Sequence, residues 1–171
     1  SEADLTAIFE TALRLLETLG MGEVPDNLAA TLLACGATRN DRDRFLLPRS
    51  LVLEAIEQTP KVFPLHGRDP ARSIMVGGDA VHFGTGGAAV QTLDLDSGLY
   101  RPSTLQDLHD FTRLQDTLEN VSWFTRCCVA TDVPDNFDLD VNTVYALLRN
   151  TTKPVATSFT LAEHVDPIVE M

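Results

Sequence analysis

The hydrophobic positions along the chain follow a helical period over the first sixty residues. Apolar side chains recur there every three to four positions, which is typical of amphipathic helices. The expected helices are one that ends at Gly20, one from an Asp26 N-cap to Gly36, and one from Pro48 until Pro60 approaches. Arginines and aspartates alternate at 39–44, and we interpret this mixture of charges as a solvent-exposed surface.

Between residues 61 and 101 the period changes to two, which predicts strands. The expected strands are residues 62–65, 74–76, 80–83, 88–95 and 99–101. Pro64 makes the first an edge strand, because proline cannot donate to a central ladder. Turn residues at 77–79 predict a hairpin of 74–76 with 80–83, and those at 96–98 predict a second hairpin.

The last seventy residues alternate between helical and strand patterns. The expected helix starts are a capping box of Ser103 and Gln106, a cap at Asp135 or Asn136, and a capping box of Thr160 and Glu163. Strands are expected at 121–129 and 154–159. With 88–95 as the first strand, the pattern gives three strand–helix pairs on a parallel sheet.

Three such pairs do not close a (β/α)8 barrel, which needs about 250 residues. The pattern therefore predicts either a small open sheet or the opening part of a barrel. In the second case the apolar edge at 155–159 would need a partner to cover it. The chain begins without Met and stops at Met171 inside an amphipathic pattern, so we expect a piece of a longer protein.

Composition excludes several classes of partner. The 171 residues hold 13 Lys and Arg against 25 Asp and Glu, a net charge of −12. Such a surface repels nucleic acid and anionic membranes. No apolar run reaches the roughly 20 residues of a membrane helix, and no secretory leader is recognisable. Three cysteines make a poor disulfide framework, which predicts a reducing, cytoplasmic location.

The glycine-rich run at 83–89 (FGTGGAA) has the loose form of a dinucleotide-binding loop. That function requires a helix directly afterwards, whereas residues 90–95 alternate like a strand. Glycines at a strand crossing or bulge explain the run better. A third interpretation makes Thr85, Gly86 and Gly87 a floor of small residues over which a substrate approaches the backbone.

The four histidines show no spacing typical of a metal site, so no metal is expected. Cys127 and Cys128 have no sequence neighbour that would activate them, and we interpret both as small buried hydrophobic residues.

Loops after parallel strands carry binding and catalysis in α/β folds. Thr131 and Asp132 follow one expected strand, and Thr157 and Ser158 end the next, which makes all four candidate substrate-binding residues. Arg126 is a further candidate, because a strand arginine is usually paired with a carboxylate, and Asp132 is one potential partner.

Several ordered runs resemble the trimethylamine:corrinoid methyltransferase family. They are LHGRDPAR at 65–72, VHFGTGG at 81–87, LDLDSG at 93–98, RPST at 101–104, DVP at 132–134 and YALLRNTTKP at 145–154. Their order and spacing span nearly the whole chain.

The resemblance implies an enzyme that moves a methyl group from trimethylamine, or from a quaternary amine such as glycine betaine, to the cobalt of a separate corrinoid (cobalamin) protein. It also implies an α/β fold: N-terminal helices (1–60), a β-hairpin element (61–86) and the first three βα units of an incomplete TIM barrel (87–171). The catalytic residues are then expected in the C-terminal half of the family, outside this chain, and the corrinoid is expected on the partner.

Other expectations stay open beside the resemblance. A homo-oligomer is expected, and the fragment alone is expected to be inactive. The alternatives are a nucleotide-binding module that uses residues 84–87 and a non-catalytic assembly segment. The resemblance does not choose between methylated amines, nor does it show whether the enzyme uses pyrrolysine.

Overall fold

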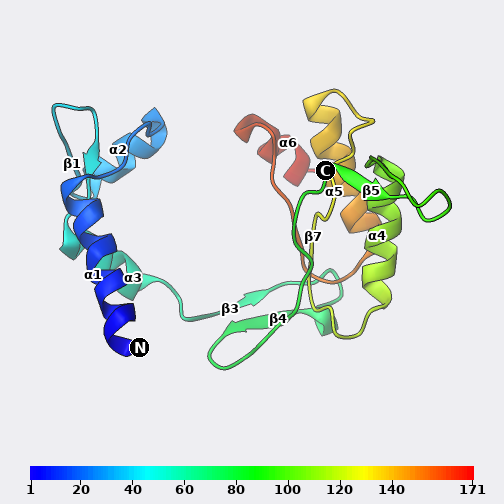
Figure 1. Cartoon of the computed structure of the whole chain (residues 1–171), viewed down its shortest axis with the longest axis horizontal. Helices are drawn as coiled ribbons and strands as arrows, with labels where there is room; N and C mark the ends of the chain where they lie inside the picture. The colour runs from blue at the N-terminus through cyan, green and yellow to red at the C-terminus, as the bar shows by residue number, and fades with distance from the viewer. The chain divides into compact units, whose positions relative to one another are not determined.

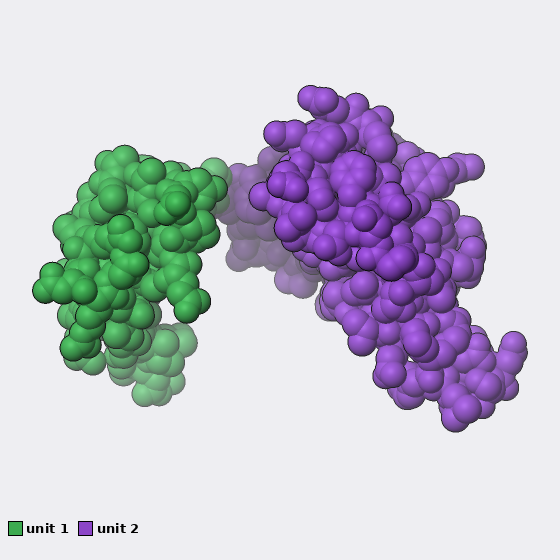
Figure 2. Space-filling view, turned by 90° about the horizontal axis from the view of Figure 1, so that it is seen from above, with its two compact units in different colours: residues 1–60 green, residues 61–171 purple.

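A computed structural model describes residues 1–171 as a mixed α/β chain with six α-helices and four two-stranded sheets. The strands form no closed barrel. The chain divides into two compact units, residues 1–60 and residues 61–171 (Figure 2). No helix combines the length and the apolar character needed to cross a membrane.

The first unit contains the three predicted helices: α1 (Glu2–Thr18), α2 (Asp26–Ala34) and α3 (Arg49–Gln58). Their starts need two small corrections. Asp26 is the first residue of α2 and makes no side-chain cap, because Pro25 occupies the N-cap position. Pro48 is likewise the N-cap of α3 and lies just before its first turn.

A short hairpin in this unit was not predicted. Strands β1 (Thr38–Arg39) and β2 (Phe45–Leu46) pair antiparallel. The Arg39 guanidinium lies 5.4 Å from the centre of the Phe45 ring and forms an ion pair with Asp43. The charged residues therefore lie in the turn of a hairpin. Phe45 of this hairpin is buried, as are Leu13 and Ala37.

In the second unit β3 (Val62–Leu65) is confirmed, and its partner is the strand that was predicted to pair with residues 80–83. It pairs with β4 (Ile74–Gly77), and the short 3-10 helix η1 (Pro70–Arg72) makes the connection. Residues 80–83 join no named strand, so the hairpin predicted around residues 77–79 is wrong. Gly77 ends β4 with φ +119°, and a Cβ there would lie 2.0 Å from the carbonyl oxygen of Lys61.

The second predicted hairpin is confirmed as β5 (Gln91–Leu93) and β6 (Tyr100–Pro102). It leads into α4 (Leu105–Thr117), whose capping box uses Thr104 and Asp107 instead of the predicted Ser103 and Gln106. Helix α5 (Asn136–Asn150) starts at the predicted Asp135 cap. The last predicted helix is split into η2 (Ala162–His164) and α6 (Val165–Val169), without a side-chain cap from Thr160.

Three parallel segments lie side by side in chain order. Strand β7 (Phe124–Thr125) pairs in parallel with β8 (Val155–Ala156). On the other side of β7, segment 84–89 makes two parallel bridges, Gly84 with Trp123 and Ala89 with Cys128. The first parallel segment is therefore 84–89 and not the predicted 88–95, because residues 91–93 turn away into the β5–β6 hairpin.

The core of this unit lies between the parallel segments and two helices, α4 and α5, which pack against each other (Figure 1). Five fully buried residues form it: Leu108, Phe124, Cys128, Ala146 and Leu147. Burying one large apolar side chain stabilises a fold by about 1.5–3 kcal/mol. Helices α4 and α5 thus pack on one face of the parallel segments, and this packing holds the strand ends from which the carboxyl-edge loops begin.

Candidate functional site

The backbone ladder defines where the carboxyl ends of the three parallel segments lie. Ser122 N–H donates to the carbonyl of Phe83 (2.8 Å), and Val129 N–H donates to that of Ala89 (2.9 Å). The chain leaves these segments at residues 90, 129–132 and 157–159. Thr131, Asp132, Thr157 and Ser158 therefore fall on the carboxyl edge, where α/β folds place their sites, whereas Thr85, Gly86 and Gly87 lie within the first segment.

The glycine run is part of the first parallel segment. A Cβ on Gly84 would lie 2.2 Å from the Trp123 ring, so the backbone passes directly against the indole. The Thr85 hydroxyl donates to the carbonyl of Thr125 (2.8 Å) and accepts from Thr125 N–H (3.0 Å), which replaces a backbone pair of the ladder. Gly86 and Gly87 are exposed beyond it.

This arrangement does not fit a dinucleotide-binding loop. Such a loop opens directly into a helix whose N-terminus holds the pyrophosphate. Here the β5–β6 hairpin intervenes, and the next helix starts only at Leu105. Close backbone packing therefore explains Gly84, and the positive φ of +102° explains Gly87. Gly86 lies beside open space.

Thr131 and Asp132 hold the start of α4. The Thr131 hydroxyl donates to the carbonyl of Ser103 (2.7 Å), and one Asp132 carboxylate oxygen accepts from Leu105 N–H (2.8 Å). A carboxylate at this place satisfies an unpaired N–H and favours the positive end of the helix. Both side chains thus have a structural role at the carboxyl edge, which their sequence position alone did not reveal.

Arg126 is paired with Ser158 and not with Asp132, so the predicted ion pair is wrong. Arg126 Nη2 donates to Ser158 Oγ at 2.9 Å, and Thr157 Oγ1 donates to the carbonyl of Ser158 at 3.3 Å. The structure thereby brings together three of the predicted residues, Arg126, Thr157 and Ser158. All three side chains lie next to the carboxyl end of β8.

An ion-pair cluster at the first turn of α4 was not predicted. Arg101 Nη1 and Nη2 donate to the two oxygens of Asp107 at 2.6 and 2.8 Å, and Arg101 also pairs with Asp94. The Arg101 hydrogen bonds, together with those from Thr104, lower the pKa of Asp107 to about 2 although partial burial opposes this. The only sequence signal is the RPST run followed by an acid three residues later. The cluster fixes the β5–β6 hairpin to the first turn of α4.

The two adjacent cysteines differ in their surroundings. Cys128 is buried in the core, whereas Cys127 is half-buried. A hydrogen bond between the thiols, together with burial, raises the pKa of Cys128, and the same bond lowers that of Cys127. Both line a cavity of about 390 Å³ that Phe111 and Gln115 of α4 also border. The prediction of a buried apolar role is confirmed for Cys128.

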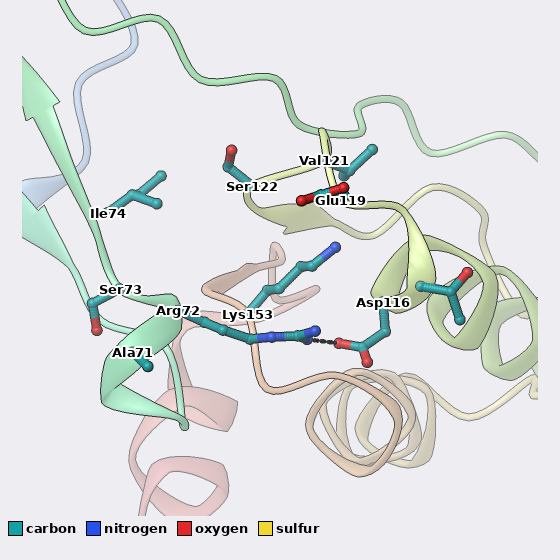
Figure 3. Close-up of a pocket in the computed structure, with 10 residues that line it drawn as sticks. Ala71, Arg72, Ser73, Ile74, Asp116, Glu119, Val121, Ser122 and Lys153 are labelled. Atoms are coloured by element: carbon teal, nitrogen blue, oxygen red, sulfur yellow. Dashed lines mark hydrogen bonds and ion pairs between the residues drawn. The ribbon is translucent and has the colours of Figure 1, made fainter.

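A charged pocket of about 370 Å³ lies at the opposite, amino end of the parallel segments (Figure 3). Arg72 and Asp116 form an ion pair there, and Asp116 also accepts from the Thr151 hydroxyl at 2.7 Å. Lys153 Nζ donates to the carbonyls of Gln115 (2.7 Å) and Leu118 (2.8 Å). Lys153 thereby satisfies carbonyls at the carboxyl end of α4, which is a structural role.

A second buried polar group connects α5 with the last turns of the chain. His164 Nδ1 lies 2.7 Å from Asp140 Oδ2, which also accepts from the Thr160 hydroxyl at 2.8 Å. Burial opposes ionisation of Asp140, but the hydrogen bonds from His164 and Thr160 outweigh it and lower its pKa. Thr160 therefore anchors the chain to α5 and does not cap a helix as predicted. No group of three or more His, Cys, Asp and Glu side chains could hold a metal ion.

Comparison with known proteins identifies the family. The family model described as trimethylamine methyltransferase (MTTB) matches residues 1–171. The chain belongs to this family. The match includes all the sequence runs that suggested the resemblance, and it also includes the three parallel segments and the residues at their carboxyl edge.

Named relatives cover the same region at moderate identity. Trimethylamine methyltransferase MttB of Desulfitobacterium hafniense is 28% identical over 157 residues, which cover 91% of this chain and 31% of the relative. Glycine betaine methyltransferase of the same species is 26% identical over 172 residues, 100% of this chain and 35% of the relative. Trimethylamine methyltransferase MttB1 of Methanosarcina mazei is 30% identical over 127 residues, 72% and 24% respectively. The chain thus spans about a third of the first two relatives and a quarter of the third.

Proposed function

We propose that the protein transfers a methyl group from trimethylamine, or from a related methylated or quaternary amine such as glycine betaine, to the cobalt of a corrinoid protein. The observation that carries this proposal is the family match over residues 1–171, because relatives named for both kinds of amine align with the chain. Corrinoid dependence is part of the proposal, with the corrinoid carried by the partner.

The arrangement of the second unit supports a place for this chain in the enzyme. Segment 84–89, β7 and β8 follow one another as parallel neighbours, with α4 and α5 between them in sequence. We take them as the first three strands of a (β/α)8 barrel, whose other strands lie in the part of the relatives that this chain does not cover. Catalytic residues are proposed to lie there as well.

The chemistry fits a site without an acid–base pair. In transfer from a quaternary amine the carbon–nitrogen bond breaks, nitrogen keeps its electron pair, and cobalt supplies the pair for the new bond. No proton moves, so alignment of donor and acceptor decides the rate. In this proposal, residues of the first segment and of the carboxyl edge bind and orient the amine: Thr85, Gly86, Gly87, Arg126, Thr131, Asp132, Thr157 and Ser158.

The test is a methyl-transfer assay. The full-length protein that contains this chain is used, because the 171 residues alone are expected to be inactive. It is mixed with a corrinoid protein reduced to cobalt(I) and with trimethylamine, glycine betaine or choline. Loss of the cobalt(I) absorbance, together with the demethylated amine in mass spectrometry, is the expected result for at least one donor. A reaction without the protein is the control. Absence of transfer from every methylated amine, with a corrinoid protein active toward another methyltransferase, would overturn the proposal.

A further inference from the structure

Asp140 of α5 carries the most deeply buried carboxylate of the chain. Its side chain is fully shielded from solvent, and an ionised carboxylate in such a place is stable only when hydrogen bonds replace the lost water. Oδ2 accepts from the backbone N–H and from the hydroxyl of Thr160, both at 2.8 Å, and lies 2.7 Å from His164 Nδ1. Oδ1 is buried without a partner, so one oxygen carries all the contacts.

The segment that follows β8 supplies all of these contacts. At one end this segment is paired in the parallel sheet as far as Ala156, and at the other end its Thr160 is fixed to Asp140 through the backbone and the side chain. Only three residues lie between the two fixed points, and they include Thr157 and Ser158. The place of these two candidate substrate-binding side chains therefore depends on the bond to Asp140.

His164 holds the carboxylate of Asp140 in place. The histidine ring is buried and packs edge-on against Phe137, with the ring centres 5.1 Å apart and the ring planes at 82°. A ring enclosed by such packing has little freedom to turn. Its bond to Oδ2 therefore keeps that oxygen directed at Thr160.

We propose that Asp140 is a positioning residue of the enzyme, which acts through Thr160 on the three residues that precede Thr160. Thr157 and Ser158 are thereby held at the carboxyl edge for the methylated amine. This inference rests on the proposed function and adds to it a residue that does not touch the substrate. Methyl transfer depends on alignment, and a loop fixed at both ends avoids the entropy loss that a free loop would suffer on binding.

The experiment measures methyl transfer by the full-length protein that contains this chain, with each donor that the wild type demethylates. Thr160→Val removes the hydroxyl with little change of shape, and Thr160→Ser keeps the hydroxyl. Asp140→Asn removes the charge of the buried carboxylate. Asp138→Asn is the matched control, because it removes an exposed carboxylate from the same helix.

We expect Thr160→Val to raise the KM for the amine about 3- to 10-fold, which corresponds to the usual worth of one hydrogen bond. Asp140→Asn should raise it at least as much, because the bonds to Thr160 and His164 both weaken. Thr160→Ser should restore the wild-type KM, and Asp138→Asn should leave it unchanged. A smaller folded fraction lowers only the apparent kcat, so the KM separates positioning from a loss of stability. Circular dichroism verifies the fold of each variant.

A double-mutant cycle tests whether the effect passes through the loop. The cycle compares Thr160→Val in the wild type with Thr160→Val in a protein that already carries Thr157→Val and Ser158→Ala. If Thr160 acts by placing those two side chains, its substitution changes the KM much less in their absence. Fully additive effects in folded proteins would overturn the proposal.

The remaining outcomes separate this inference from the proposed function. An unchanged KM in a folded Thr160→Val variant overturns the inference and leaves methyl transfer standing. If the wild type demethylates no donor, the proposed function fails, and amide hydrogen exchange at residues 158–161 decides whether Asp140 positions the loop. Faster exchange there in Asp140→Asn, with unchanged exchange in the core of α4, supports the positioning role. Equal exchange in Asp140→Asn and Asp138→Asn overturns it.

Discussion

At the scale of single residues, Gly84 and Gly86 differ in the space around their Cα atoms, although only Thr85 separates them in the sequence. Gly84 faces the Trp123 ring at a distance that leaves no room for a methyl group, while nothing lies within 4 Å of a Cβ on Gly86. Gly84→Ala should therefore lower the free energy of unfolding by about 1–3 kcal/mol, the usual cost of overpacking. Urea unfolding followed by Trp123 fluorescence measures it.

Gly86→Ala is the matched control, since it adds the same methyl group into open space. Its free energy of unfolding should stay within about 0.5 kcal/mol of wild type. Equal stability of the two variants would show that the indole does not pack on Gly84. A loss of substrate binding in Gly86→Ala without a loss of stability would instead support the small-residue floor.

The polar residues of the site show how far sequence reasoning reaches at this scale. Position after a strand made Thr131, Asp132, Thr157 and Ser158 candidates, and the structure places all four at the carboxyl edge. Their partners were not predictable, because the Asp132 bond to Leu105 spans 27 residues and depends on where α4 begins. The wrong pairing of Arg126 with Asp132 has the same cause, because Ser158 lies 32 residues from Arg126 along the chain.

At the scale of elements, helices were predicted better than strands. Helices α1, α3 and α5 carry their own signals, a repeat of apolar positions and a cap or stop residue within a few positions. Strand partners depend on contacts far along the chain, so β4 was assigned to the wrong neighbour and the hairpin of β1 and β2 was missed. Two-residue strands such as β7 and β8 have almost no period to detect.

The carboxyl end of α4 depends on Lys153, which precedes β8. Its ammonium donates to two carbonyls of the last turn, so Lys153→Met leaves both without a donor in a buried place. We expect the variant to lose about 1–3 kcal/mol of unfolding free energy. Amide hydrogen exchange should also become faster at residues 114–118 than elsewhere in α4.

Glu119→Gln provides the control for Lys153, because Glu119 lines the same pocket but makes no ion pair (Figure 3). Its stability should match wild type within about 0.5 kcal/mol. If Lys153→Met were as stable as Glu119→Gln, the hydrogen bonds from the Lys153 ammonium to the last turn of α4 would not stabilise the fold.

At the scale of the whole molecule, the sequence indicated βα units after residue 86 and the structure supplies their order. Three parallel segments in chain order were inferred from alternating patterns alone, and the order is confirmed, with the first segment moved to 84–89. Whether these segments belong to a barrel does not follow from them, because three parallel neighbours look the same in a small open sheet and in the first part of a barrel. The barrel therefore stays part of the proposed function.

Acid should unfold the second unit through carboxylates that join separate elements. Asp107 joins the β5–β6 hairpin to α4, and Asp116 joins α4 to residues 151–152. Burial opposes ionisation of Asp116, but the Thr151 hydroxyl and the Arg72 charge lower its pKa. A carboxylate with a lowered folded pKa stabilises the fold above its unfolded pKa, and that stability is lost as pH falls through the folded value.

For Asp107 this window lies between the ordinary pKa of 3.8 and the folded value of about 2. After allowance for solvent screening, Asp107 should contribute about 1–2 kcal/mol of stability that disappears between about pH 4 and 2. Asp107→Asn removes this contribution, so the variant should be less stable at pH 7 and should lose less stability on acidification. Trp123 fluorescence against pH in moderate urea measures both. Asp110→Asn, an exposed carboxylate of α4, should keep the wild-type slope, and an unchanged slope in Asp107→Asn would mean that its pair with Arg101 does not stabilise the fold.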